Sequence, residues 1–213
     1  MSAGVGLSER AAALLREAAF WRLLGLFFEA PRQGWAEEVT SLASTLPEEE
    51  DLRLAARLAA EEGSPSLYES LLGPGGPAAP RETSHRPEIL PGPLLAEVAA
   101  YYENFSYAPA LQEPPDHVAV ECGFLGFLKL KEAFALEADQ QEKALVAAEA
   151  FQSFLERHLR EVAEPLAASL APLGVFYLQK AAEELLRRTG PKPAQSLPPP
   201  PPEGAEEGCP FQD

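Results

Sequence analysis

The chain has 213 residues, enough for one domain of about 150 residues and a short extension. It carries 17 basic and 33 acidic residues, a formal net charge of −16, and 46% of its residues are hydrophobic. Because nucleic acids and anionic membrane surfaces are bound through clustered lysine and arginine, this charge argues against both and favours a cationic partner, such as an arginine-rich peptide.

The cysteines and the hydrophobic segments favour the cytoplasm. Cys122 and Cys209 lie far apart and give neither a disulfide framework nor a zinc-binding spacing. The first ten residues lack the cationic start of a signal peptide, and no run reaches the roughly 18 uncharged residues that cross a membrane. We therefore expect a cytoplasmic protein with no signal peptide and no stable membrane insertion.

Apolar residues at helical spacing dominate the first third of the chain. The pattern in residues 7–29 is typical of a helix, with Ser8 placed to cap its start and Pro31 following its end. No segment alternates apolar and polar residues as a strand does. The sequence predicts an all-α fold, with further early helices over 35–45, 48–61 and 66–72.

Proline and glycine are dense from Gly73 to Pro93, which excludes a continuous helix there. A loop of about 20 residues is uncommon inside a compact domain and is usually functional or mobile. The helical pattern resumes over Leu94–Phe105 and breaks again near Pro109.

The segment Asp116–Leu136 is apolar nearly all round in its first half, which indicates a central buried helix. Gly123 and Gly126 would allow a neighbouring helix to approach closely. An amphipathic stretch follows over residues 140–170, and Pro165 should end or kink it.

The last predicted helix, residues 175–188, is followed by an abrupt change to a proline-rich, acidic composition. Such a segment buries too little apolar surface to fold by itself. We expect a single globular, bundle-like helical domain over residues 1–190 and an extended or disordered tail over 191–213.

The histidines, which are scarce, give little support for catalysis or metal binding. His158 lies within the amphipathic stretch, where a structural role is typical. Glu82 and His85 form one Glu-x-x-His motif, whereas a carboxylate-bridged metal pair needs two on facing helices. We expect no metal and no cofactor.

The most unusual polar cluster is the stretch from Glu113 to Glu121. Asp116 is placed to cap the following helix, and His117 and Glu121 are four residues apart, so they share a face. One interpretation is structural, with helix capping and a His–Glu contact. The other is that Glu113, Asp116 and Glu121 form an acidic mouth for a cationic ligand.

An Asp116–His117 pair is also compatible with a small hydrolase. However, no serine, threonine or cysteine stands in a recognisable nucleophile motif, and Cys122 belongs to the apolar helix. This alternative requires a nucleophile within hydrogen-bond reach of His117. We therefore expect a protein that is not an enzyme.

A second cluster runs from Tyr68 to Pro74. By itself it is typical of a short helix that glycine and proline terminate. The Gly-Pro-Gly-Gly sequence that begins at Gly73 is not followed by Gly-Lys-Ser/Thr, so nucleotide binding has no support.

Together the two clusters resemble the TorD/DmsD/NarJ-like family of redox-enzyme maturation chaperones. Tyr68-x-x-Leu71-Leu72-Gly73-Pro74 is similar to the family's "aromatic, two residues, Leu-Phe, x, Gly-Pro" element, with the x missing and leucine in place of phenylalanine. Glu113-Pro114-x-Asp116-His117 is similar to its Glu-Pro-x-Asp-His motif, and the resemblance covers roughly residues 7–188.

The resemblance implies an all-helical, non-enzymatic cytoplasmic chaperone, monomeric or dimeric. It would bind the twin-arginine leader or the apo form of a molybdopterin-dependent oxidoreductase catalytic subunit and assist cofactor insertion before export. The loop after Gly73 would be a mobile cover, and an alternative is an assembly protein that recognises a folded subunit without its leader. The expected binding residues are Tyr68, Leu71, Leu72, Gly73, Pro74, Glu113, Pro114, Asp116, His117 and Glu121.

Overall fold

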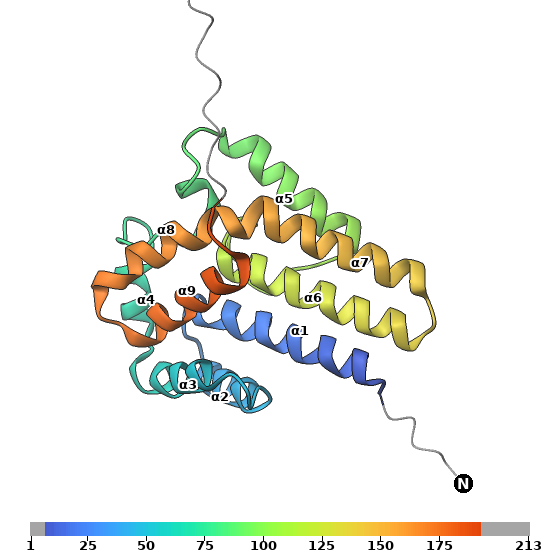
Figure 1. Cartoon of the computed structure of the whole chain (residues 1–213). Coiled ribbons are helices and arrows are strands. Elements are labelled where there is room, and N and C mark those ends of the chain that lie inside the picture. The colour runs from blue at the N-terminus through green and yellow to red at the C-terminus, as the bar shows by residue number, and fades with distance from the viewer. Residues whose placement is uncertain (1–6, 193–213) are drawn as a thin grey trace, which may run out of the picture.

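The computed structural model describes residues 7–192, which form an all-α domain with no β-strand in that range (Figure 1). The predicted fold class is confirmed, while nearly all of the predicted tail, including Cys209, lies outside the described residues. The helices are α1 (Glu9–Phe27), α2 (Trp35–Ser44), α3 (Glu50–Glu62), α4 (Pro65–Leu71), α5 (Pro91–Phe105), α6 (Val118–Glu137), α7 (Gln141–Phe154), α8 (Arg160–Leu170) and α9 (Phe176–Thr189).

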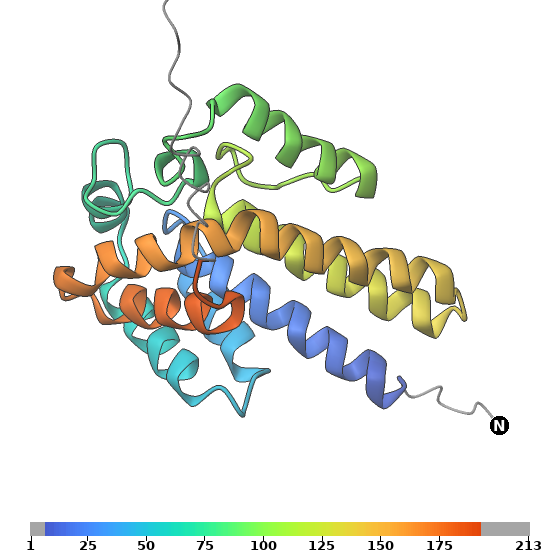
Figure 2. The same ribbon diagram turned by 45° about the horizontal axis from the view of Figure 1, so that its top comes forward.

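Helix α6 is the central helix, as its composition predicts. It packs most extensively against α1 and α7, and α1 runs beside it in both views (Figures 1 and 2). Phe124, Leu125 and Leu128 are fully buried, whereas Gly123 and Phe127 on another side of the helix are partly accessible. Within residues 7–192, no helix has the length and apolar character needed to cross a membrane.

Glycines set the short distance between α1 and α6. A Cβ atom on Gly25 would lie 2.9 Å from the Ala119 carbonyl oxygen, and one on Gly126 would lie 3.0 Å from that of Ala18. The predicted role of Gly126 fits this geometry. Gly123 instead faces the side chain of Tyr107, whose hydroxyl oxygen would lie 2.5 Å from an added Cβ.

The long amphipathic stretch forms one nearly continuous rod from α7 to α8 (Figure 2). Of the two outcomes predicted for Pro165, an end or a kink, the first is wrong, since α8 continues through it to Leu170. Val162 and Leu166 on either side of the proline are fully buried, and this packing holds the helix together. Regular α geometry is interrupted earlier, at a single π-helical turn, η2 (Leu155–Leu159).

The loop between α4 and α5 is part of the core. It contains a short 3₁₀ turn, η1 (Glu82–Ser84), and Ala78 and Glu82 have no exposed surface. The expected mobile cover is therefore wrong for this middle part of the loop. Helix α5 begins at Pro91, three residues before the predicted start, because prolines are well accommodated in a first helical turn, where no amide donor is needed.

Replacing Gly25 with alanine should destabilise the domain. The added methyl group must push α6 away from α1, and overpacking of this kind costs about 1–3 kcal/mol of the free energy of unfolding. Gly92→Ala is the matched control, because a Cβ there meets no atom within 4 Å. Urea unfolding of both variants measures the difference, and an unchanged Gly25→Ala midpoint would contradict the close approach.

Candidate functional site

The site is built where the loop before α5 meets the start of α6. The Glu82 amide donates to the Asp116 carbonyl oxygen at 2.9 Å, and the Val118 amide donates to the Pro80 carbonyl oxygen at 2.8 Å. These bonds form an isolated antiparallel bridge between two segments far apart in the sequence. The bridge fixes the direction of the side chains on both segments.

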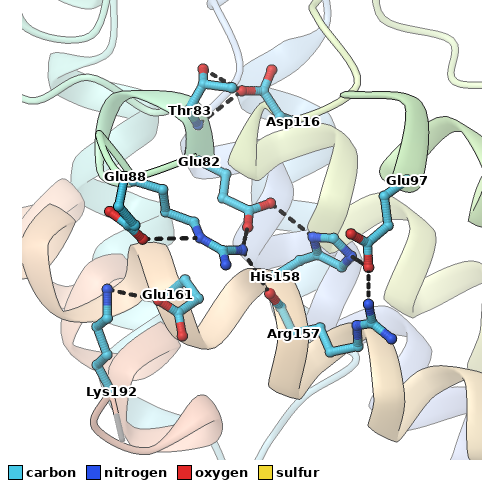
Figure 3. Close-up of polar contacts among 10 residues, drawn as sticks. Glu82, Thr83, Glu88, Glu97, Asp116, Arg157, His158, Glu161 and Lys192 are labelled. Atoms are coloured by element: carbon cyan, nitrogen blue, oxygen red, sulfur yellow. Dashed lines mark hydrogen bonds and ion pairs between the residues drawn. The ribbon is translucent and has the colours of Figure 1, made fainter. Parts of the chain in front are cut away.

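Asp116 is fully buried and accepts four hydrogen bonds from the loop. Its Oδ1 accepts from Arg81 Nε and Nη2 at 3.0 and 2.8 Å. Its Oδ2 accepts from the Thr83 amide at 3.1 Å and hydroxyl at 2.6 Å, and Figure 3 shows these two contacts. The prediction that Asp116 caps α6 is wrong, because its side chain is used in this contact. The cap is His117, whose Nδ1 accepts from the Ala119 amide at 3.2 Å.

His117 connects the two predicted clusters. Since its Nδ1 is an acceptor, its proton is on Nε2, which lies 3.2 Å from the Tyr68 hydroxyl oxygen. The Tyr68 hydroxyl in turn donates to Glu113 Oε1 at 3.4 Å. The structure therefore brings Tyr68, Glu113 and His117 together, whereas His117 and Glu121 form no hydrogen bond with each other.

Burial lowers the pKa of His117 to about 4, so the imidazole is neutral at pH 7. The same burial, with the carboxylate of Glu113 nearby, raises the pKa of the Tyr68 hydroxyl. Both groups therefore act as neutral hydrogen-bonding groups. A chain of hydrogen bonds thus runs from the Ala119 amide through His117 and Tyr68 to the Glu113 carboxylate and links that carboxylate to the start of α6.

A second buried cluster lies on the inner side of the loop. Glu82 is fully buried, with Oε2 at 2.9 Å from His158 Nδ1 and Oε1 accepting from Arg86 Nη1 at 2.6 Å (Figure 3). His158 belongs to the π turn η2 and is also buried. Its structural role fits the interpretation from sequence, although its partner was not foreseen.

Glu121 completes this cluster from α6. It is fully buried, and neither carboxylate oxygen has a hydrogen-bond partner among the described residues. Burial, together with the neighbouring carboxylates of Glu82 and Asp116, raises the pKa of Glu121 well above its usual value. The buried position therefore favours the protonated form of Glu121.

The carboxylates of Glu82 and Glu121 and the imidazole of His158 lie within 4.8 Å of one another. Their types suit a divalent cation such as Zn²⁺. However, the Arg86 guanidinium already neutralises Glu82, and Glu121 would have to lose a proton in a fully buried position. His85 contacts the Ala79 carbonyl oxygen at 2.8 Å and is not part of the cluster.

The expected acidic mouth is wrong in this arrangement, because Asp116 and Glu121 have no exposed surface. Desolvating a carboxylate is costly, and each one is instead paired or protonated. Of the remaining predicted residues, Tyr68, Leu72, Gly73 and His117 are buried. The accessible ones are Leu71, Pro74, Glu113 and Pro114.

The hydrolase alternative lacks a nucleophile. Among the described residues, the ring nitrogens of His117 form hydrogen bonds with the Ala119 amide and the Tyr68 hydroxyl. Cys122 is fully buried, and burial raises the pKa of its thiol. Within residues 7–192, no serine, threonine or cysteine side chain is hydrogen-bonded to a ring nitrogen of His117, which the hydrolase alternative requires.

Sequence reasoning missed Arg81, Thr83 and Arg86, which hold the buried carboxylates. A signal was present, since residues 81–86 are six consecutive polar residues inside a loop otherwise rich in proline, glycine and alanine. A polar run in such a loop indicates partners elsewhere in the fold. Which partners these are depends on the tertiary structure.

The fold and the site define an all-helical protein whose accessible motif residues suit binding to a partner. A family model described as "Nitrate reductase delta subunit" matches residues 29–168, more than half of the chain and both motif segments. The chain belongs to this family, whose members are redox-enzyme maturation chaperones for molybdoenzymes and not catalysts. The comparison with curated proteins gives no match.

The neutral state of His117 should make the domain less stable in acid. Below pH 6.5 the unfolded chain takes up a proton that folded His117 does not accept until about pH 4. The free energy of unfolding should therefore fall by about 3 kcal/mol between pH 7 and pH 4 from this group alone. His117→Asn keeps an acceptor for the Ala119 amide, and urea titrations should show a smaller loss for this variant; an equal loss would contradict the assignment.

Replacing Glu121 with glutamine should stabilise the protein at pH 7. Above pH 4.5 the unfolded chain loses the Glu121 proton that the folded protein keeps, so this group lowers stability as the pH rises. Glutamine removes that effect and still supplies a donor. Thermal unfolding at pH 7 and pH 4.5 should show a gain at the higher pH only, and a loss at pH 7 would mean that Glu121 is ionised.

Proposed function

We propose that this protein is a cytoplasmic chaperone for the catalytic subunit of a molybdopterin-dependent oxidoreductase. It would bind the subunit through its twin-arginine leader and hold it until the cofactor is inserted, before export. Membership of the nitrate reductase delta subunit family supports an oxidoreductase as the partner. The two motif segments support the mode of binding.

The observation that carries the proposal is the contact of Tyr68 with His117 and Glu113. It joins the two motifs and leaves the carboxylate of Glu113 partly accessible beside Tyr68. Leu71, one helical turn from Tyr68, and the exposed Pro74 supply apolar surface nearby. A leader with paired guanidiniums and an apolar run would fit such an edge, because a guanidinium forms strong hydrogen bonds with a carboxylate.

The predicted binding residues thus divide into two groups. Leu71, Pro74, Glu113 and Pro114 would contact the partner. The buried residues would position this edge, and they are Tyr68, Leu72, Gly73, Asp116, His117 and Glu121. Substitution of a buried residue would affect folding as well as binding, so it does not test the proposal.

Glu113→Gln should weaken binding of a twin-arginine leader peptide by about 10- to 100-fold, because one charge-assisted hydrogen bond is lost. Isothermal titration with a synthetic leader peptide measures this effect. Glu103→Gln is the matched control, since it removes one negative charge from an exposed position of α5. Equal affinity of the two variants would refute the role of Glu113.

The burial of Asp116 and Glu121 favours a second candidate, since it leaves few carboxylates for two guanidiniums. In this alternative the protein recognises a folded oxidoreductase subunit without its leader. Titration with the isolated leader and with the subunit lacking it separates the two. Binding of the leaderless subunit together with no binding of the leader would select the second candidate.

A further inference from the structure

A groove of about 610 Å³ lies at the end of the domain where α6 ends and α7 begins. We call it the distal groove. Its apolar lining comes from the last residue of α5 and from α6, α7 and the turn between them, and consists of Phe105, Phe134, Ala135, Ala138, Val146 and Ala147. Figure 1 shows this end of α6 and α7 at the far end of the rods from α4.

Large apolar side chains are exposed at the distal groove. Phe134 is 65% exposed and Val146 is 54% exposed, and the neighbouring Leu145 is 60% exposed. Elsewhere in the described chain most large apolar residues are buried in one core. A contiguous exposed apolar patch of this kind commonly marks an interaction surface.

The charged side chains that line the groove are mostly positive. Lys129, Lys180 and Lys192 each form an ion pair, whereas Lys131 and Lys143 have no carboxylate of residues 7–192 within salt-bridge distance. Both unpaired lysines line the distal groove, together with the single acidic residue Glu142. The net charge of the residues that line the groove is therefore positive, whereas the net charge of the whole chain is −16.

We propose that the distal groove binds an amphipathic helix of a partner protein, with acidic residues beside its apolar face. The apolar face would cover Phe134 and Val146, and the acidic residues would pair with Lys131 and Lys143. A helix fits because the groove runs between antiparallel α6 and α7, which a third helix can pack against.

The distal groove is separate from the proposed leader-binding edge formed by Leu71, Pro74, Glu113 and Pro114, which we call the motif edge. The motif edge lies at the start of α6 and the groove at its end, and a helix of 20 residues separates them by about 30 Å. The inference therefore does not depend on leader binding. One partner could contact both surfaces only through two different segments.

Two designed helical peptides of 18 residues test the proposal. Both carry leucine at helical spacing, and the flanking positions are glutamate in one and lysine in the other. The full-length protein should bind the glutamate peptide about tenfold more tightly in fluorescence anisotropy at low salt, because attraction replaces repulsion at two lysines. Lys131→Glu/Lys143→Glu should remove or reverse this preference.

The matched control is Arg53→Glu/Arg57→Glu, which makes the same change in net charge at exposed positions of α3. It should keep the preference for the glutamate peptide. The proposal is overturned when neither peptide binds, when the two bind equally, or when both double variants lose the preference alike. The last outcome would mean that only net charge matters.

Two other occupants give different results. If a second copy of the chain covers the groove, sedimentation will show a dimer that Phe134→Ser dissociates. If the chain's own tail covers it, the peptides will bind only to a full-length variant with Glu206→Gln, Glu207→Gln and Phe211→Ser. Either result would overturn binding of a partner helix.

Discussion

The carboxylate of Asp116 is the group on which the rest of the site depends. A buried carboxylate is costly unless its oxygens are well satisfied, and four donors from Arg81 and Thr83 meet this requirement. The loop must therefore fold against the start of α6, although its own sequence favours no regular structure. This placement of the loop also brings Glu82 into contact with His158. The contact between Glu82 and His158 therefore depends on the contact between Asp116 and the loop.

The two motifs consequently act first as parts of the fold. Asp116 and His117 lie side by side, but the former holds the loop and the latter caps α6 and holds Tyr68. Burial and the neighbouring Glu82 raise the pKa of Glu121. Leu71, Pro74 and Glu113 form the accessible edge, and the buried motif residues beneath it hold it in position. A partner would meet this edge, and the most characteristic acidic residues would remain inside.

The helices could be predicted because apolar periodicity reports directly which side is buried, and the first half of α6 is apolar nearly all round. The site was harder for a physical reason. Capping rules consider only neighbouring residues. The Asp116 carboxylate instead binds Arg81, which is distant in the sequence, and so it does not cap α6. Pro165 is similar, because burial of Leu166 outweighs the lost hydrogen bond. Periodicity contains no information on which loop residue meets which helix.

Helix α6 places the two proposed binding surfaces at the ends of one rigid rod of about 30 Å. Two segments of one partner bound at such a distance reinforce each other, since the second contact forms at a high effective concentration. An unfolded or partly folded subunit can adjust the spacing of its segments to this rod, whereas a folded subunit has a fixed spacing. Two individually weak contacts would then favour the immature partner, and completion of its fold would promote its release.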